Sequence, residues 1–206
     1  MSKKPVIVFE GIEGSGKSLY INFVSKYLLK RKISHLKLRE PGGNLNSEKI
    51  RKLILDKRSN FNKTTDLLLY SAARSENVKV LKKNYRKKII LIDRFTDSTI
   101  AYQHYGQGES LQFINNINYH LLKNFKVSFT FINIVNKKNL IKRLKQRNKL
   151  NRYDNFNTNF YEKVQRGYLE IFKKKLKKYQ IINSNLDINF NKKLIIKRIE
   201  KLIRWI

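Results

Sequence analysis

One short segment of the chain combines glycines, a lysine and a hydroxyl in a spacing that can hold phosphate groups. Residues 11–18 read Gly-Ile-Glu-Gly-Ser-Gly-Lys-Ser, the pattern G-x-x-x-x-G-K-[ST]. Glycines let successive backbone N–H groups turn toward an anion, and a following helix adds the positive end of its dipole. A glycine-rich strand-to-helix turn is the alternative, but the motif is complete and correctly placed. The segment therefore predicts a triphosphate site made by Gly11, Ile12, Glu13, Gly14, Ser15, Gly16, Lys17 and Ser18, with Lys17 on the outer phosphates and Ser18 on Mg²⁺.

An acidic and a basic residue follow the clearest apolar run of the chain. Residues 89–93 read as a buried strand, and Asp93 and Arg94 stand at its carboxyl end. Ligands bind at this end of the strands in doubly wound sheets. Asp93 could act on the metal or its water shell, and Arg94 could bridge phosphates during transfer. Such a pair is often a surface ion pair, but its position after the strand favours a functional role.

Two further polar segments are candidates for the same site. Residues 39–43, Arg-Glu-Pro-Gly-Gly, follow a second apolar run, although Pro-Gly-Gly alone more often marks a turn. Residues 143–152 hold five cations between two expected helices. They could form a solvated basic loop, or a lid that closes over the phosphoryl group and excludes water.

Alternating strands and helices must position these residues. The apolar patterns predict strands at 6–9, 36–39, 89–93, 127–134 and 179–182, and helices at 17–30, 47–55, 64–85, 98–105, 111–123, from 138, 160–178 and 192–204. Repeated β-α-β units imply an α/β, three-layer P-loop fold, with a parallel five-stranded sheet flanked by helices on both faces. We expect one domain over residues 1–206, with residues 143–159 as a basic lid.

The composition limits the remaining classes of function. The chain has no cysteine and three histidines, which excludes disulfides and thiolate metal sites. Its net charge of +31, from 46 Lys and Arg against 15 Asp and Glu, could suit nucleic acid or an anionic membrane. Because the basic residues are spread through every segment, the favoured explanation of the high net charge is drift in the composition of the sequence. No apolar run is long enough to span a membrane. We therefore expect a cytoplasmic protein that binds neither a membrane nor a specific nucleic acid.

Four ordered segments resemble the thymidylate kinase family, in its bacterial branch. They are residues 9–18, residues 39–43 with 48–51, residues 67–74 and residues 93–103, so the similarity covers nearly the whole chain. It implies a thymidylate kinase that converts ATP and dTMP to ADP and dTDP with Mg²⁺, in the synthesis of dTTP for DNA replication. It also implies a homodimer, and Ser18 and Asp93 near the metal.

The resemblance assigns the acceptor side residue by residue. Glu13 would face the sugar 3′-hydroxyl, Arg51 and Arg94 would hold the dTMP phosphate, and Glu40 would lie nearby in the acceptor and metal environment. Tyr70 would stack on thymine.

Arg74, four residues later on the same helix face, would donate to a thymine carbonyl; without it, Tyr70 would be read as a core aromatic. Ser98, Thr99 and Gln103 would complete base and sugar recognition, and Tyr102 could exclude a 2′-hydroxyl.

The bacterial branch has no arginine in its phosphate loop and takes cations from its lid. Arg147 and Arg152 are therefore the lid candidates, with Lys149 third. The expected catalytic set is Lys17, Asp93, Arg94, Arg147 and Arg152. The chain departs from the family pattern at Asn44, Asn77, Phe95 and Asn151. A kinase of another nucleoside monophosphate and a nucleic-acid-binding ATPase remain the alternatives.

Overall fold

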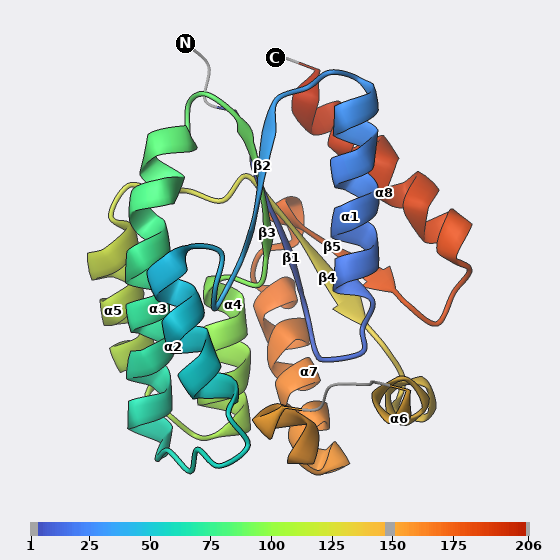
Figure 1. The fold of residues 1–206 in the computed structure, drawn as a ribbon. Coiled ribbons are helices and arrows are strands. Elements are labelled where there is room, and N and C mark those ends of the chain that lie inside the picture. Colours follow the sequence, from blue (N-terminus) through green and yellow to red (C-terminus); the bar gives the residue numbers. More distant parts are fainter. Residues whose placement is uncertain (1–3, 147–150, 205–206) are drawn as a thin grey trace.

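The computed structural model describes residues 4–146 and 151–204, and its core is one parallel sheet in the order β2-β3-β1-β4-β5 (Figure 1). The strands are β1 (Val6–Gly11), β2 (His35–Arg39), β3 (Ile89–Asp93), β4 (Phe129–Ile134) and β5 (Tyr179–Asn183). The helices are α1 (Lys17–Lys30), α2 (Leu45–Leu55), α3 (Lys63–Asn84), α4 (Thr96–Thr99), α5 (Leu111–Leu122), α6 (Lys137–Lys145), α7 (Thr158–Lys173) and α8 (Ile188–Ile203), with short turns η1 (Ile100–Gly106), η2 (Arg152–Asn155) and η3 (Leu176–Lys178). The predicted α/β fold is confirmed.

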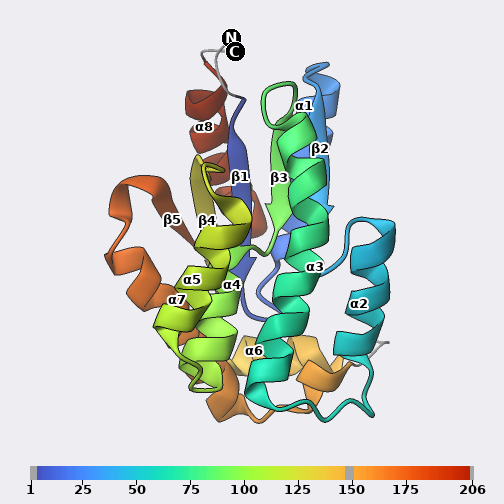
Figure 2. The same ribbon diagram turned by 90° about the vertical axis from the view of Figure 1, so that its left-hand side faces the viewer.

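Both faces of the sheet are covered by helices, as the apolar strands require. Ile7 and Phe9 of β1 pack with residues of α1 and α8 on one face. Val6 and Val8 point the other way, into a cluster with residues of α3 and α5. Figure 2 looks onto the α3 and α5 side. In the described part of the chain, no helix is long and apolar enough to cross a membrane.

Several helix starts are set by capping side chains. The side chain of Asn157 accepts a hydrogen bond from the Phe160 backbone N–H at 2.9 Å, so α7 begins at Thr158. Asp187 caps α8 in the same way, so α8 begins at Ile188, four residues before the expected start. The expected helix at 160–178 was too long, because α7 ends at Lys173 and η3 leads into β5.

The expected helix at 98–105 is replaced by α4 and a π-helical turn, η1. The wider turn carries Tyr102 and Gln103, both buried. Helix α7 approaches it closely, since a Cβ on Gly167 would lie 2.7 Å from the Tyr105 ring. Single π turns are frequent at functional sites, and η1 follows α4 after the carboxyl end of β3.

Candidate active site

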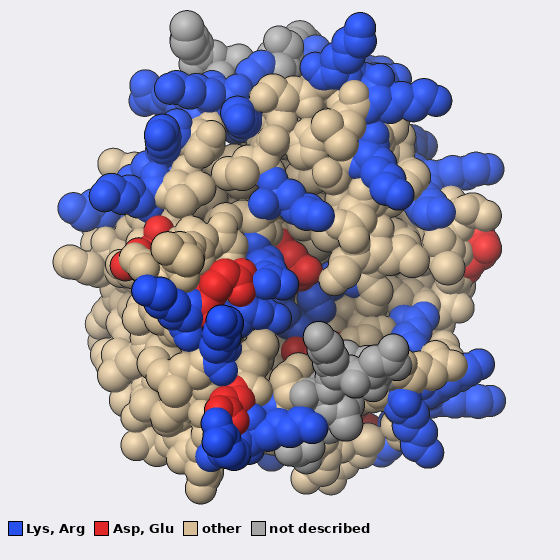
Figure 3. Space-filling view, viewed as in Figure 1, with Lys and Arg blue, Asp and Glu red and all other residues tan. Residues whose placement is uncertain are grey.

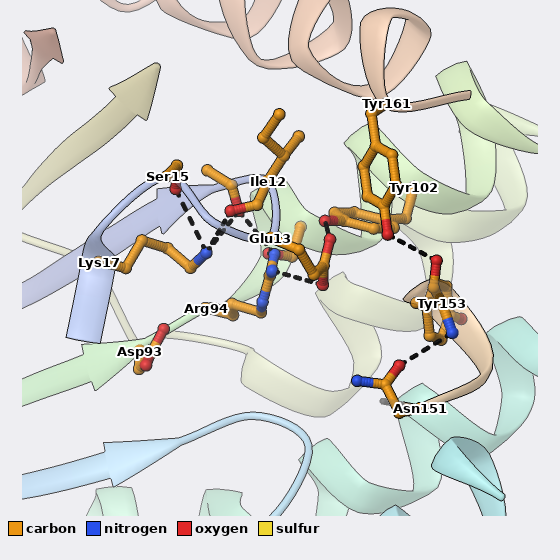
Figure 4. Close-up of polar contacts among 12 residues, drawn as sticks. Ile12, Glu13, Ser15, Lys17, Asp93, Arg94, Tyr102, Asn151, Tyr153 and Tyr161 are labelled. Atoms are coloured by element: carbon orange, nitrogen blue, oxygen red, sulfur yellow. Dashed lines mark hydrogen bonds and ion pairs between the residues drawn. The ribbon is translucent and has the colours of Figure 1, made fainter. Parts of the chain in front are cut away.

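The phosphate loop joins β1 to α1, and its lysine folds back over the loop (Figure 4). The φ angles are positive at three glycines, 139° at Gly11, 67° at Gly14 and 84° at Gly16. A Cβ at Gly11 would lie 2.3 Å from a backbone carbonyl oxygen of β4, so only glycine fits. The Lys17 ammonium donates to the carbonyl oxygens of Gly11 and Ile12, at 2.8 Å each.

Burial weakens the hydration of the Lys17 ammonium. The residue is 7% exposed. Burial and the nearby Arg94 cation lower the pKa of Lys17 from 10.5 to about 8, although Asp93 and Glu13 oppose the shift. The ammonium is still charged at neutral pH. A phosphate anion would replace the solvation that it lacks.

A hydroxyl and a carboxylate meet beside the loop. The Ser18 hydroxyl, in the first turn of α1, donates to the Asp93 carboxylate at the end of β3, at 3.3 Å. Among the described residues, no group of three or more His, Cys, Asp or Glu side chains could hold a metal. The two oxygen donors instead fit Mg²⁺, which protein sites usually bind through one or two side chains, substrate phosphates and water.

Arg94 and Glu13 form an ion pair between the loop and the helices below it. The Arg94 guanidinium donates to the Glu13 carboxylate and to the Gly11 carbonyl oxygen, at 2.7 Å each. The Tyr102 hydroxyl donates to the other Glu13 oxygen, and its ring lies 5.1 Å below the guanidinium (Figure 4). Burial raises the pKa of Glu13, but Arg94 and Lys17 outweigh it and lower the pKa overall. Glu13 is therefore a charged acceptor.

A cavity of about 430 Å³ continues from the phosphate loop into the space between α2, α3 and η1. In Figure 3 several acidic side chains lie beside Lys and Arg near the middle of the visible face. The residues that line the cavity include Glu13, Lys17, Ser18, Glu40, Arg51, Tyr70, Arg74, Asp93, Arg94, Ser98, Thr99, Tyr102 and Gln103. The structure thus brings the predicted donor and acceptor residues to one cavity.

A second buried ion pair supports the far wall of the cavity. Arg74 is 2% exposed and donates to Glu40 at 2.8 Å. It also donates to the side chains of Asn118, at 2.8 Å, and Thr99, at 2.9 Å. Burial raises the pKa of Glu40, while Arg74 opposes the shift. A guanidinium has five N–H donors, and three of those of Arg74 bond to described side chains, which leaves two for a ligand in the cavity.

Comparison with known proteins agrees with this geometry. The family model described as thymidylate kinase matches residues 9–195. The chain belongs to the thymidylate kinase family. A thymidylate kinase of Thermosipho africanus is 38% identical over 169 residues, 81% of this chain and 84% of the relative. One from Thermoanaerobacter sp. (strain X514) is 32% identical over 203 residues, 98% of this chain and all of the relative.

A solved structure leads to the same family. The crystal structure of thymidylate kinase from Ehrlichia chaffeensis superposes with a TM-score of 0.78 at 32% identity, covering 97% of this chain and 100% of that one. The predicted enzyme class and reaction, the phosphorylation of dTMP, are confirmed by membership of the family.

The thymidylate kinase residues expected to read the acceptor lie on neighbouring helices. Tyr70 and Arg74 share one face of α3, as the spacing predicted. Arg51 of α2 donates to the Pro41 carbonyl oxygen at 2.7 Å. Gln103 is 1% exposed, and its side-chain nitrogen has no hydrogen-bond partner among the described residues. A ligand in the cavity could supply the missing acceptor.

Ser98 lines the cavity and accepts a hydrogen bond from Arg94 at 3.4 Å, but its own hydroxyl donates to a residue that sequence reasoning missed. Its hydroxyl donates to Glu10 at 2.5 Å and lies 2.7 Å from the Tyr168 hydroxyl. Glu10 is fully buried and also accepts the Phe95 backbone N–H at 2.8 Å. Burial and the Asp97 charge raise the pKa of Glu10 from 4.5 to about 7. A carboxylate inside an otherwise apolar strand was the available signal.

Two departures from the family pattern contact each other in this thymidylate kinase. The side-chain nitrogen of Asn44 donates to the side-chain oxygen of Asn77 at 2.6 Å. Asn77 then donates to the Gly42 carbonyl oxygen at 2.8 Å, and Asn44 caps α2. The pair therefore holds the turn that precedes α2, and the two replacements are structurally complementary.

Of the arginines in the expected lid, Arg143 and Arg152 are described, and they lie in different surroundings. Arg147 and Lys149 lie outside the described residues. Arg152 forms an ion pair with Asp66 of α3, and it is not among the residues that line the cavity. Arg143 of α6 does line the cavity and donates to the Gly14 carbonyl oxygen at 2.8 Å. Sequence reasoning placed Arg143 in the basic stretch but gave it no role at the site.

Proposed function

We propose that this chain transfers the terminal phosphoryl group of ATP to dTMP, with Mg²⁺ at the donor phosphates. The observation that carries the proposal is the continuity of the cavity, because Lys17 and Ser18 line it together with Tyr70 and Arg74. A kinase needs both substrates in one space that excludes water, so that the phosphoryl group reaches the acceptor and is not hydrolysed.

On the donor side, the backbone N–H groups of residues 11–16 and the start of α1 would receive the phosphates. Ser18 and Asp93 would hold Mg²⁺, which when bound neutralises charge on the donor phosphates. Lys17 would exchange its two carbonyl acceptors for phosphate oxygens. Arg143, already against Gly14, is our candidate for a further donor-side cation, and Arg147 remains a lid candidate.

On the acceptor side, Arg51 and Arg94 would bind the phosphate of dTMP, and Glu13 with Tyr102 would face the sugar. Tyr70 would stack on the base, while the free N–H groups of Arg74 and the Gln103 amide would bind its polar edge.

We expect three of the predicted acceptor-side residues to act by holding other residues in place. Glu40 and Thr99 would act through Arg74, which they hold in place. Ser98 would act through Glu10.

Transfer itself would need no general base. The attacking oxygen of dTMP is already ionised, so catalysis consists of alignment and of compensating the charge that spreads over the transferred group. Lys17 and Arg94 line the same cavity and would provide this compensation. Glu13 keeps Arg94 aligned through their ion pair.

A coupled assay of ADP release tests the proposal. With ATP and Mg²⁺, dTMP should start turnover and be preferred over dUMP, dCMP, dGMP and AMP. ATP alone should be nearly inert, and single-stranded DNA should not stimulate ADP release. Lys17→Ala is the inactive control, and Lys30→Ala, at the opposite end of the same helix, is the matched active one. A preference for another monophosphate would refute the base assignment, and stimulation by DNA would favour an ATPase.

We also propose that the whole chain is one domain, with residues 143–159 as its lid, and that it forms a homodimer. Helices α3 and α5 are neighbours on one side of the molecule (Figure 2). Their exposed apolar side chains support the dimer, namely Leu68 of α3 with Phe113 and Tyr119 of α5. Tyr119→Lys should turn a dimer into a monomer in light scattering after gel filtration. A wild-type monomer would refute this part of the proposal.

A further inference from the structure

One carboxylate beside the acceptor cavity has a full set of partners but no role in the reaction described above. Asp66 lies in the first turn of α3 and is 1% exposed. One of its oxygens pairs with Arg152. The other accepts the Tyr153 hydroxyl at 2.7 Å and the Gln107 amide at 3.1 Å. Two of these donors come from consecutive residues of η2, which lies within the expected lid segment, residues 143–159.

Tyr153 connects this carboxylate to the acceptor cavity. Its ring is 2% exposed and lines the cavity. It meets the Tyr70 ring edge to face with centroids 6.2 Å apart, and the Tyr102 ring at 5.8 Å. These two rings are those assigned to the base and the sugar. The position of Tyr153 therefore bears on the shape of the space for dTMP (Figure 4).

The contacts of Arg152 hold its side chain in one position. Its side chain is 12% exposed. Its guanidinium lies 5.4 Å from the Phe61 ring centroid and 5.1 Å from that of Tyr153. Burial lowers the pKa of Arg152, but Tyr153 and Asp66 outweigh it and raise the pKa overall. A cation held by an almost fully buried carboxylate and by two aromatic rings is costly to remove.

We propose that Asp66, one helical turn before Tyr70 on α3, is a positioning residue that holds Arg152 and Tyr153 of η2 in place. It thereby sets the position of the Tyr153 ring in the wall of the dTMP pocket. The proposal rests on the function proposed above. Because Asp66 and Tyr70 are four residues apart, they lie on the same face of α3. Tyr153 thereby takes its position from the same helix that presents the base-stacking ring.

Asp66→Asn is the first test, since it keeps the shape of the side chain and removes its charge. We expect KM for dTMP, and the Kd for dTMP measured by calorimetry without ATP, to rise about 10-fold. We expect kcat and KM for ATP to stay within about 3-fold, because the donor loop does not touch Asp66. Asp56→Asn is the matched control: Asp56 also pairs with an arginine, Arg58 at 2.9 Å, but on the exposed end of α2, and its kinetics should match wild type.

Tyr153→Phe is the second test and serves if Asp66→Asn does not fold. It keeps the ring and loses the hydroxyl, with its bonds to Asp66 and Arg152, so KM for dTMP should rise by about 3-fold or more with kcat little changed. Wild-type affinity for dTMP in a folded Asp66→Asn, or in Tyr153→Phe in its place, would overturn the inference. The inference would also be overturned if kcat fell and both KM values rose by similar factors, because such a change indicates general damage to the protein. A wild-type enzyme that does not bind or phosphorylate dTMP would instead overturn the proposed function, and the inference with it.

Discussion

The guanidinium of Arg94 lies 2.7 Å from the carboxylate of Glu13, at the boundary between the phosphate loop and the acceptor cavity. Their side chains are 17% and 15% exposed. Removing one member of such a pair leaves the other charge without a partner in a poorly solvated place. The two residues therefore depend on each other, and their ion pair joins the phosphate loop to the residue that follows β3.

Arg94→Ala should lower kcat by about 10² to 10³, because it removes a fixed cation from the point where charge redistributes in transfer. Glu13→Gln should have a smaller effect, and the double variant should lose less than the two single losses combined. Steady-state kinetics on the four proteins measure this coupling. Arg31→Ala, which breaks the exposed pair with Glu200, is the control with wild-type kinetics. Near-normal kcat in Arg94→Ala would contradict the assignment.

The pH dependence of donor use should follow Lys17. Its pKa in the free enzyme is lowered to about 8, so its positive charge is lost as the pH rises through that value. The value of kcat/KM for ATP reports the free enzyme and should fall above about pH 8. Lys17→Arg, which keeps its charge, should move or remove this limb even if its rate is lower. An identical limb in Lys17→Arg would mean that another group titrates.

The stability of the protein should carry a pH-dependent contribution from Glu10. Its pKa rises from 4.5 to about 7 in the folded protein, so the stability gained by its protonated form is complete below pH 4.5 and is lost as the pH rises through 7. Wild type should therefore gain in Tm relative to Glu10→Gln when the pH falls from 8 to 5. Thermal unfolding of both proteins at each pH measures the difference. The same difference at both pH values would contradict the shift.

Asn77→Ala should destabilise the fold by about 1–3 kcal/mol, because it leaves the buried Gly42 carbonyl oxygen and the Asn44 amide without their partner. Urea unfolding gives the free energy. Asn46→Ala, which removes an exposed bond to Glu76, is the matched control and should change it by less than about 0.5 kcal/mol. Equal effects of the two substitutions would show that the Asn44–Asn77 contact adds little.

The amino-acid sequence alone determined the donor side of the site. The phosphate loop depends on glycines at Gly11, Gly14 and Gly16 and on the strand and helix beside it, all within one short segment. Asp93 and Arg94 could be placed for the same reason, since a parallel strand leaves the residues after it at the carboxyl edge of the sheet. The face shared by Tyr70 and Arg74 follows from helix periodicity. Each of these predictions needed only local geometry.

The tertiary structure alone decided which polar side chains pair. The Ser98 hydroxyl could face a ligand or Glu10, and packing of α7 brings Tyr168 to the same carboxylate, 158 positions from Glu10. Arg152 was expected at the phosphates and lies on Asp66, 86 positions away. Such choices depend on which acceptor is buried and close once the core has formed, and residue spacing along the chain does not contain that information. The sequence thus determined the conformation of the loop at residues 11–18 and the position of Asp93 and Arg94 beside it, and the fold decided which partners hold the side chains around the cavity.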